Sequence, residues 1–222
     1  EAGGAGRGRS LHDRLCTRGA ATMLRRQHRM HERIMALPNR AFYGGALEAA
    51  PEARHRLLDI EPARAGALPA WLATAIVPEE PMVLVDVPGG SDDRLNEREA
   101  RLVAEAAAAL RRAGLDASRM GVVTPYRAQV ALIRRTFAAD ETLREVPVDT
   151  VERFQGDERD AILVSLVGGR PTGHLAHPNR INVTLTRARS KLIVFGDAEG
   201  LSRDPLLENL VRQEETTRVR AK

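Results

Sequence analysis

Four short segments of the sequence carry residue types that bind phosphate groups and nucleic acids. They read LRRQHRMH at residues 24–31 (with FYGG at 42–45), GVVTPYRAQ at 121–129, DTVERFQGDE at 149–158 and RINVTLTRAR at 180–189. An arginine guanidinium stays protonated and donates paired hydrogen bonds to phosphate oxygens, and hydroxyl groups can add further bonds. An arginine taken at random is more often a surface residue in a salt bridge. The position of these segments in the fold is therefore needed to distinguish phosphate binding from a surface salt bridge.

The elements that position these segments follow an α/β pattern. Short runs rich in β-branched residues alternate with helical patterns, which predicts one domain with a mainly parallel sheet. The predicted strands span residues 82–87, 121–124, 148–151, 162–167 and 192–195. The predicted helices span residues 95–112, a stretch after Pro125 that buries Val130, Ile133 and Phe137, and residues 179–188. Each of the four segments should then lie at the carboxyl end of a strand or at the start of a helix, where α/β domains bind ligands.

The remaining parts of the chain have weaker patterns. Residues 49–81 are rich in Ala, Pro and Arg around Trp71, and we interpret them as a surface excursion. We expect a flexible leader at residues 1–9, one domain at residues 10–213 and a frayed polar tail at residues 214–222. Because the first residue is Glu1 and not Met, the chain resembles a piece of a longer protein.

Composition narrows the class of protein without choosing the function. The 34 basic and 30 acidic residues leave a net charge of +4, which allows binding to a polyanion but does not require it. A single cysteine, Cys16, excludes an internal disulfide framework and fits an ordinary core thiol in a reducing cytoplasm. The sequence has no run of about 18 apolar residues and no signal peptide. We therefore expect a soluble, cytoplasmic protein that does not enter a membrane.

Taken in order and at their spacing, the four segments resemble motifs IV, IVa, V and VI of the superfamily 1 helicases. They are most similar to the branch of the nonsense-mediated-decay helicase and the Okazaki-fragment helicase-nuclease. The resemblance extends from about Ser10 to Asp197 and is carried by the phrases TPYRAQ, DTVERFQGDE and NVTLTRAR. It implies the C-terminal RecA-like motor domain of such a helicase, an α/β fold of the P-loop NTPase type that lacks its own P-loop.

The resemblance also implies half of an ATP site. Its candidate cofactor-binding residues are Gln27, His28, Arg29, Gly156, Glu158 and Arg187. Arg187 would be the arginine finger and Arg29 a second contact to the γ-phosphate, which makes these two the candidate catalytic residues. Their physical task would be to stabilise the charge that develops on the transferred phosphoryl group. Glu158 would hydrogen-bond the ribose, and the alternative for all three residues is a surface salt bridge.

Two positions depart from the pattern of the family. The family usually has a tyrosine that stacks on the adenine where this sequence has His28. Imidazole is smaller and can be charged, so we expect the base to be held less firmly, or with a pH dependence near the usual histidine pKa of about 6.5. The alternative is a half-buried histidine with a structural hydrogen bond. Glu32 stands where the family usually has Pro, and we attach no function to it.

For nucleic acid, the resemblance points to residues at the openings of two helices, namely Thr124, Pro125, Tyr126, Gln129 and Thr150. Free N–H groups at a helix N-terminus and nearby hydroxyls hold phosphates without reading bases, so binding to single-stranded DNA or RNA should tolerate any sequence. The alternative for Tyr126 is a core position on the helix face of Val130 and Ile133. With 3% aromatic residues, extended base stacking is not expected.

A P-loop is missing from the sequence. It needs a Gly-Lys pair followed by Ser or Thr, and the two lysines here are Lys191, which follows Ser190, and the terminal Lys222. We therefore expect ATP with Mg²⁺ to be held mainly by a preceding RecA-like domain of the same polypeptide, and the isolated chain to be inactive. The alternative is a free-standing nucleic-acid-binding or regulatory module that kept the fold and lost the chemistry.

Overall fold

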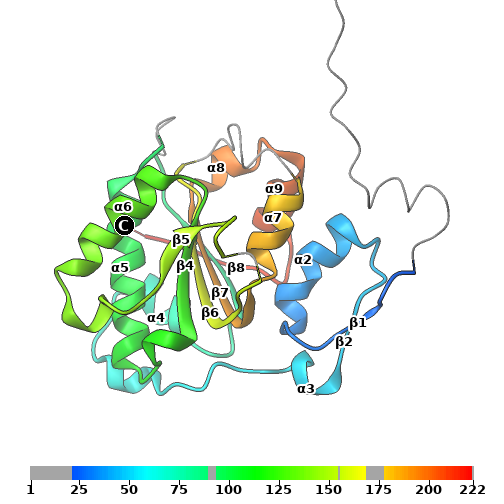
Figure 1. Cartoon of the computed structure of the whole chain (residues 1–222), viewed down its shortest axis with the longest axis horizontal. Helices are drawn as coiled ribbons and strands as arrows, with labels where there is room; N and C mark the ends of the chain where they lie inside the picture. Colours follow the sequence, from blue (N-terminus) through cyan, green and yellow to red (C-terminus); the bar gives the residue numbers. More distant parts are fainter. Residues whose placement is uncertain (1–21, 90–93, 155, 169–177, 222) are drawn as a thin grey trace, which may run out of the picture.

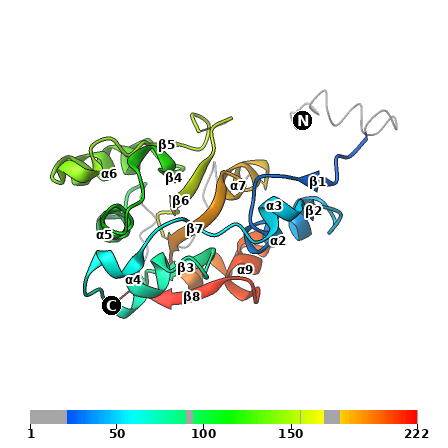
Figure 2. The ribbon, with the colours of Figure 1, turned by 90° about the horizontal axis from the view of Figure 1, so that it is seen from below.

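The structure is a computed structural model that describes residues 22–89, 94–154, 156–168 and 178–221. These residues form a central sheet between two layers of helices (Figure 1). The same three layers are seen from below in Figure 2. The leader predicted at residues 1–9 and Cys16 lie outside the described residues.

The central sheet has six strands in the order β5-β4-β6-β7-β3-β8, and every neighbouring pair is parallel. Its strands are β3 (Met82–Asp86), β4 (Met120–Thr124), β5 (Val148–Thr150), β6 (Arg159–Ser165), β7 (Ala188–Gly196) and β8 (Thr217–Arg220). A separate parallel pair is formed by β1 (Arg26–Gln27) and β2 (Glu48–Ala49). The predicted α/β class with a mainly parallel sheet is confirmed.

Helices cover both faces of this sheet (Figures 1 and 2). They are α2 (Glu32–Phe42), α3 (Pro51–Arg54), α4 (Ala70–Ile76), α5 (Glu97–Arg112), α6 (Arg127–Ala138), α7 (Pro178–Leu185), α8 (Ala198–Leu201) and α9 (Pro205–Arg212), with short 3-10 turns η1 (Pro62–Ala65), η2 (Ala117–Arg119) and η3 (Glu141–Leu143). Helices α4, α5 and α6 share one hydrophobic core, and α2, α7, α8 and α9 share the other.

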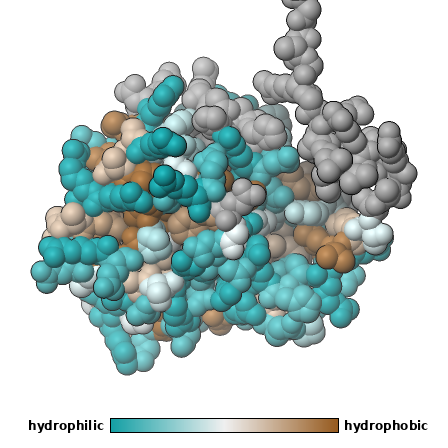
Figure 3. Space-filling model, viewed as in Figure 1, coloured by the Kyte–Doolittle hydropathy of each residue, from teal (hydrophilic) through white to brown (hydrophobic). Residues whose placement is uncertain are grey.

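The strands divide their side chains between these two cores. In β3, Val83 and Val85 join the core of α4–α6, while Met82 and Leu84 join the core of α2 and α7–α9. This alternation follows from the two-residue repeat of a strand, and it explains why β3 is buried throughout. The outer surface seen in Figure 3 is largely hydrophilic, as expected for a sheet whose faces are both covered.

Local sequence signals place the crossover helix α5. Asn96 caps it by accepting a hydrogen bond from the Glu99 backbone N–H at 3.0 Å, and the Asn96 side-chain amide donates back to the Glu99 carboxylate at 3.3 Å. The Asn96 side chain is therefore the N-cap of α5. After the helix, Gly114 takes a φ of 101°, a left-handed conformation that a residue with a Cβ rarely adopts.

Lys191 is fully buried in β7 and does not face a ligand. Its ammonium donates hydrogen bonds to the carbonyl oxygens of Val77, at 2.7 Å, and Glu80, so it ties the end of α4 to the sheet. Burial lowers the pKa of Lys191 to about 7, against the favourable charge of Glu80. Its place in the sheet is a structural reason why this lysine cannot serve as a P-loop lysine.

Two expectations about the outer parts of the chain are wrong. Residues 49–81 are not a surface excursion, because α4 packs on the sheet and buries Trp71 and Ile76 in the core. The tail at 214–222 is not frayed, because β8 pairs in parallel with β3. A polar segment can form an edge strand when its backbone satisfies an open sheet edge and its charges find partners. Here Arg218 donates to the buried carboxylate of Asp86 at 2.8 Å.

This ion pair leads to the first prediction. Arg218→Met should lower the free energy of unfolding by about 1–3 kcal/mol, because it leaves Asp86 buried without its charged partner. Arg220→Met, two residues along the same strand at an exposed position, should change it by less than about 0.5 kcal/mol. Urea denaturation of both variants measures the difference, and equal effects would show that the Arg218–Asp86 contact does not hold the tail.

Candidate functional site

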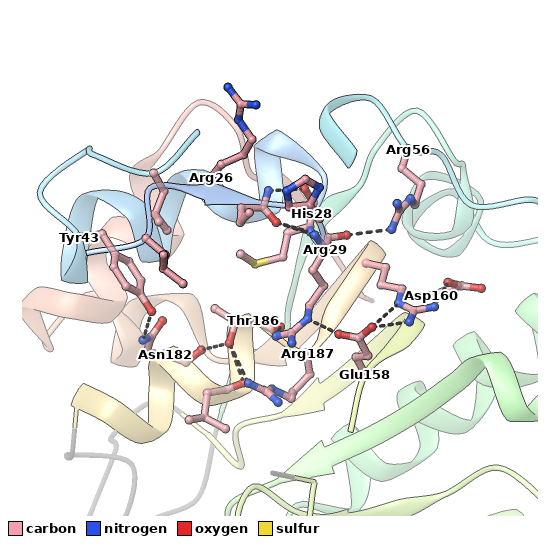
Figure 4. A pocket seen from close by; sticks show the side chains of 16 residues that line it. Arg26, His28, Arg29, Tyr43, Arg56, Glu158, Asp160, Asn182, Thr186 and Arg187 are labelled. Atoms are coloured by element: carbon pink, nitrogen blue, oxygen red, sulfur yellow. Dashed lines mark hydrogen bonds and ion pairs between the residues drawn. The ribbon is translucent and has the colours of Figure 1, made fainter. Parts of the chain in front are cut away.

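A cavity of about 910 Å³ opens where the β1–α2 turn faces the beginnings of β6 and β7 (Figure 4). Arginines dominate its charged lining, which consists of Arg26, Arg29, Arg56, Arg187 and Arg189 with the carboxylates Glu158 and Asp160. Several cations that converge with few anions make the cavity a candidate site for a polyanionic ligand such as a phosphate chain.

The turn that carries Arg29 is built by the side chain of Gln27. The Gln27 amide oxygen accepts hydrogen bonds from the backbone N–H groups of Arg29 and Met30 at 2.8 and 2.7 Å, and its nitrogen donates to the Met30 carbonyl at 2.8 Å. His31 then caps α2, because its Nδ1 accepts from the Arg33 N–H at 3.0 Å. These local bonds fix the backbone from which the Arg29 side chain reaches into the cavity.

Glu158 lies between two of the arginines. Its Oε2 accepts from Arg29 Nε, and its Oε1 accepts from Arg189 Nε at 2.9 Å and from Arg189 Nη2. Burial opposes ionisation of this carboxyl group, but the hydrogen bond from Arg189 and the charge of Arg29 outweigh it and lower the pKa of Glu158. Glu158 is therefore ionised, and its carboxylate lies between the guanidinium groups of Arg29 and Arg189.

Arg187 is held differently from Arg29. Its guanidinium donates to the carbonyl oxygens of Val183, at 2.9 Å, and Asp157, at 3.4 Å. Within the described part of the chain, no carboxylate lies within ion-pair distance of it. Burial, and next the nearby charge of Arg29, lower the pKa of Arg187 from its ordinary value. The alternative of a surface salt bridge is therefore wrong for Arg187, which is a partly desolvated cation with no carboxylate at ion-pair distance in the described residues, although the charges of Glu158 and Asp157 still favour its charged form.

The structure brings together most of the predicted cofactor-binding residues. Gln27, His28, Arg29, Glu158 and Arg187 all line the cavity. Gly156 is outside its lining, exposed and in a left-handed turn with a φ of 91°. The His28 side chain is 64% exposed, and its Nδ1 lies 2.5 Å from Glu52 Oε1. The alternative of a half-buried His28 with a structural hydrogen bond is therefore wrong about burial and right about the hydrogen bond, and stacking on adenine stays a prediction.

The predicted positions of the segments at strand ends are only partly right. Glu158 and Arg187 directly precede β6 and β7, so they lie at the amino edge of the sheet. The expectation of a carboxyl end or a helix start is wrong for them, because α7 ends before β7 and delivers Arg187 to the opposite edge. Thr124 and Thr150 do end their strands, and they are register partners in β4 and β5. The two groups of candidate residues lie at opposite edges.

Among the candidates for nucleic acid, two are half-buried and three are buried. Pro125 and Tyr126 are half-buried at the start of α6, and Thr150 is 8% exposed. Gln129 and Thr124 are fully buried, and the hydroxyl of Thr124 has no hydrogen-bond partner. The predicted direct contacts of Gln129 and Thr124 to a phosphate are therefore wrong, because α5 and the sheet cover both side chains. Tyr126 occupies the N-cap position of α6.

Sequence reasoning missed five charged residues at these two sites, namely Arg26, Arg56, Arg127, Asp160 and Arg189. Arg189 could have been found, because it has the same orientation as Arg187 at the start of a strand and belongs to the same segment. Arg127 could also have been found, because an exposed cation in the first turn of α6 opposes the helix dipole and favours an anion. Arg56 and Asp160 had no motif to mark them, and Arg56 enters by donating to the Arg29 carbonyl at 3.1 Å.

The described residues were also inspected for metal sites and membrane spans. They contain no group of three or more His, Cys, Asp or Glu side chains arranged to hold a metal ion. None of the helices in this part of the chain has the length and apolarity needed to cross a bilayer.

The sequence matches the AAA domain family over residues 7–199, and its curated relatives are superfamily 1 helicases. The chain belongs to this helicase family. It is 33% identical to the Regulator of nonsense transcripts 1 homolog of Arabidopsis thaliana, over 93% of this chain and 17% of that protein. It is also 33% identical to the DNA replication ATP-dependent helicase/nuclease DNA2 of Mus musculus, over 95% of this chain and 22% of that protein.

The fold comparison agrees with this family. The structure of the C-terminal domain of a possible DNA helicase from Lactobacillus plantarum superposes with a TM-score of 0.51 at 13% identity. The match covers 86% of this chain and 98% of that domain. This confirms the predicted RecA-like fold. The chain spans about a fifth of the length of the helicase relatives described above.

The histidine cap behind Arg29 generates a prediction about pH. Burial, with help from His55 and Arg33 and against Glu32, lowers the pKa of His31. The folded chain therefore holds this imidazole neutral, and its contribution to stability is present above the unfolded pKa of about 6.5 and is lost as the pH falls. His31→Asn keeps a capping oxygen that cannot titrate. The wild-type free energy of unfolding should fall more steeply than that of His31→Asn between about pH 7.5 and about pH 5.

Urea denaturation at the two pH values measures this difference. Because the wild type and His31→Asn share all other titrating groups, the variant also serves as the control for the general destabilisation of the chain by acid. Parallel losses of stability in both proteins would mean that the Nδ1 cap of His31 contributes nothing to the stability of the chain.

Proposed function

We propose that the chain is the second motor domain of an ATP-dependent helicase that moves along single-stranded nucleic acid. One observation carries the proposal: Arg187 is a partly buried guanidinium, held by backbone carbonyls and lacking a carboxylate partner, at the mouth of an arginine-lined cavity. A cation in this state is already desolvated and oriented. It can therefore stabilise negative charge that arrives from outside with little reorganisation.

The cavity residues have distinct roles in this proposal. Arg187 acts as the arginine finger that stabilises the charge developing on the γ-phosphate during its transfer. Arg29 is the second contact, and it reaches the phosphate by exchanging its bond to Glu158 for one to phosphate oxygens. Glu158, once released by Arg29, has an oxygen available to accept a hydrogen bond from the ribose. His28 stands at the position of the adenine-stacking side chain, and Gly156 lies on the turn that leads to Glu158.

The residues fit one end of a nucleotide and not the whole of it. Guanidinium groups suit the terminal phosphate, but the described residues offer no carboxylate cluster or lysine for magnesium and the remaining phosphates. We propose that ATP with Mg²⁺ is held mainly by a preceding RecA-like domain of the same polypeptide. Bound there, Mg²⁺ would neutralise phosphate charge during the transfer. This chain by itself should not hydrolyse ATP.

The nucleic-acid track lies at the opposite edge of the sheet. Pro125, Tyr126 and Arg127 open α6, whose first N–H groups have no side-chain cap, and Thr150 lies beside them at the end of β5. Uncapped N–H groups and a cation suit a phosphate, whereas nothing in this set reads a base. The substrate in this proposal is single-stranded nucleic acid, either DNA or RNA, and the cytoplasm is its place of action.

The role of Arg187 is tested in the full-length protein. Arg187→Ala should lower the steady-state ATPase rate at saturating single strand by a factor on the order of 10³, with nucleotide affinity much less affected, because a finger acts on transition-state charge. Arg187→Lys should recover little of this rate, since a point charge does not replace the planar fork. Turnover is measured beside nucleotide titration.

Arg180→Ala is the matched control, because Arg180 is an arginine on the same segment that pairs with Glu152 outside the cavity. It should keep near-normal turnover. If Arg187→Ala also kept near-normal turnover, the finger assignment would fail, and a free-standing module without ATPase chemistry would be the better description.

The track leads to a separate prediction about salt. Arg127→Ala should weaken binding of the full-length protein to a single strand and reduce the slope of log affinity against log salt by about 1, as expected for one lost phosphate contact. Arg135→Ala removes an exposed arginine from the last turn of the same helix and should leave the slope unchanged. Titration of a labelled oligonucleotide at several salt concentrations measures both, and equal slopes would move the track away from α6.

A further inference from the structure

A fully buried carboxylate, Glu99, lies at the carboxyl edge of the sheet, away from the nucleotide cavity. All of its hydrogen-bond partners are donors. Oε2 accepts from Ser165 Oγ at 2.6 Å and from the Val167 N–H at 2.9 Å, and Oε1 accepts from the Gly168 N–H at 2.7 Å. Asn96 completes the set through its side-chain amide. The arrangement thus matches an acceptor-only, ionised carboxylate.

The backbone around Glu99 is shaped to meet this carboxylate. Val167 has a φ of 60°, and Gly168 has a φ of 86°. Val167 is the one non-glycine residue with positive φ in the described parts of the chain. A β-branched residue rarely adopts this conformation, so the surrounding structure must enforce it. Its result is that two successive N–H groups converge on one anion, as in the backbone nests that bind phosphates.

The same network holds the first turn of α6. Gln129 donates from its amide nitrogen to Ser165 Oγ at 3.0 Å and to the Asn96 carbonyl at 3.1 Å, and its oxygen accepts from the Asn96 N–H at 2.8 Å. Ser165 therefore links Gln129 to Glu99. Thr124, which follows the register pair Val123–Val164, ends β4 with its buried hydroxyl unpaired. Three elements, α5, α6 and β6, are joined at one point directly behind the helix opening that we assign to the track.

We propose that Glu99 is a positioning residue for nucleic-acid binding, whose ionised carboxylate holds the end of β6 and, through Ser165 and Gln129, the phosphate-gripping opening of α6. It does not touch the nucleic acid itself. The inference rests on the proposed function, since it needs the track at the start of α6. It gives a role to Gln129, which is too deeply buried to contact a phosphate.

Protonation of Glu99 should weaken this arrangement. Burial raises the pKa of Glu99 to about 7, against the hydrogen bonds from Ser165, Gly168 and Val167, and Asp197 at the cap of α8 adds to the rise. The partners supplied by α6 and β6, Gln129 and Ser165, are neutral. A protonated carboxyl group replaces one acceptor by a donor among groups that already donate. Single-strand binding should therefore weaken as the pH falls through this range.

Glu99→Gln is the direct test, because the amide has the shape and the donor of the protonated acid. The full-length protein is titrated with a labelled oligothymidine, without nucleotide, at about pH 6 and at about pH 8, on either side of the titration. The wild type should bind about tenfold more tightly at the higher pH, the usual effect of one charge-assisted hydrogen bond. Glu99→Gln should bind at both pH values with the affinity of the wild type at the lower pH.

Stability provides a readout that separates positioning from folding. A carboxyl group whose folded pKa is raised makes folding less favourable above its unfolded pKa, so the uncharged Glu99→Gln should melt at the same or a higher temperature than the wild type at about pH 8. Weaker binding in a protein that is no less stable supports a positioning role. Glu97→Gln removes an exposed carboxylate from the same helical turn and should change neither the affinity nor its pH profile.

The failing outcomes are distinct. If Glu99→Gln binds as the wild type does at both pH values, or loses affinity only as far as it loses stability, Glu99 is structural and the inference is overturned. If the wild type binds no single strand, or if Arg127→Ala leaves its salt slope unchanged, the track itself is overturned, whatever Glu99 does.

Discussion

The parallel direction of every strand in the central sheet is the constraint on which the sites depend. Parallel strands place all their amino ends on one edge and all their carboxyl ends on the other, about one strand length apart. Glu158 and Arg187 lie at the amino edge, while Thr124, Thr150 and Glu99's partners lie at the carboxyl edge. The sheet thus separates the proposed nucleotide site from the proposed nucleic-acid track, and β6 contributes to both.

Electrostatics explains why so many arginines can share one cavity. Glu158 neutralises Arg29 and Arg189 together, and Asp160 lies near Arg189, so the repulsion between these cations is largely compensated. Arg187 has no ion pair in the described residues, and its guanidinium donates to backbone carbonyls and to the Thr186 hydroxyl. An uncompensated charge is costly inside a protein and is retained where a ligand supplies the missing partner. The cavity therefore combines two arginines that are paired with carboxylates, Arg29 and Arg189, with one that is not, Arg187.

The sequence was informative where local patterns determine the structure. Hydrophobic runs located five of the strands and the helices α5 and α6, and the motif phrases located five residues of the cavity. The tail was missed because β8 depends on the distant edge of β3 and on Asp86, which no local pattern reveals. The burial of Gln129 was missed for a similar reason, since the helix that covers it is set by Asn96 in another segment. Arg56 belongs to a stretch with no clear periodicity.

The two outer strands of the sheet, β5 and β8, have a consequence for how copies of this protein behave in concentrated solution. An open edge strand can pair with another chain and seed aggregation. Here β8 carries exposed arginines at alternate positions, Arg218 and Arg220, and at the other edge the three-residue β5 has its Val148 carbonyl covered by the guanidinium of Arg134. The charged arginines block β8, and the Arg134 side chain covers the backbone of β5. The described sheet is therefore protected against strand pairing between copies without a barrel or a covering helix.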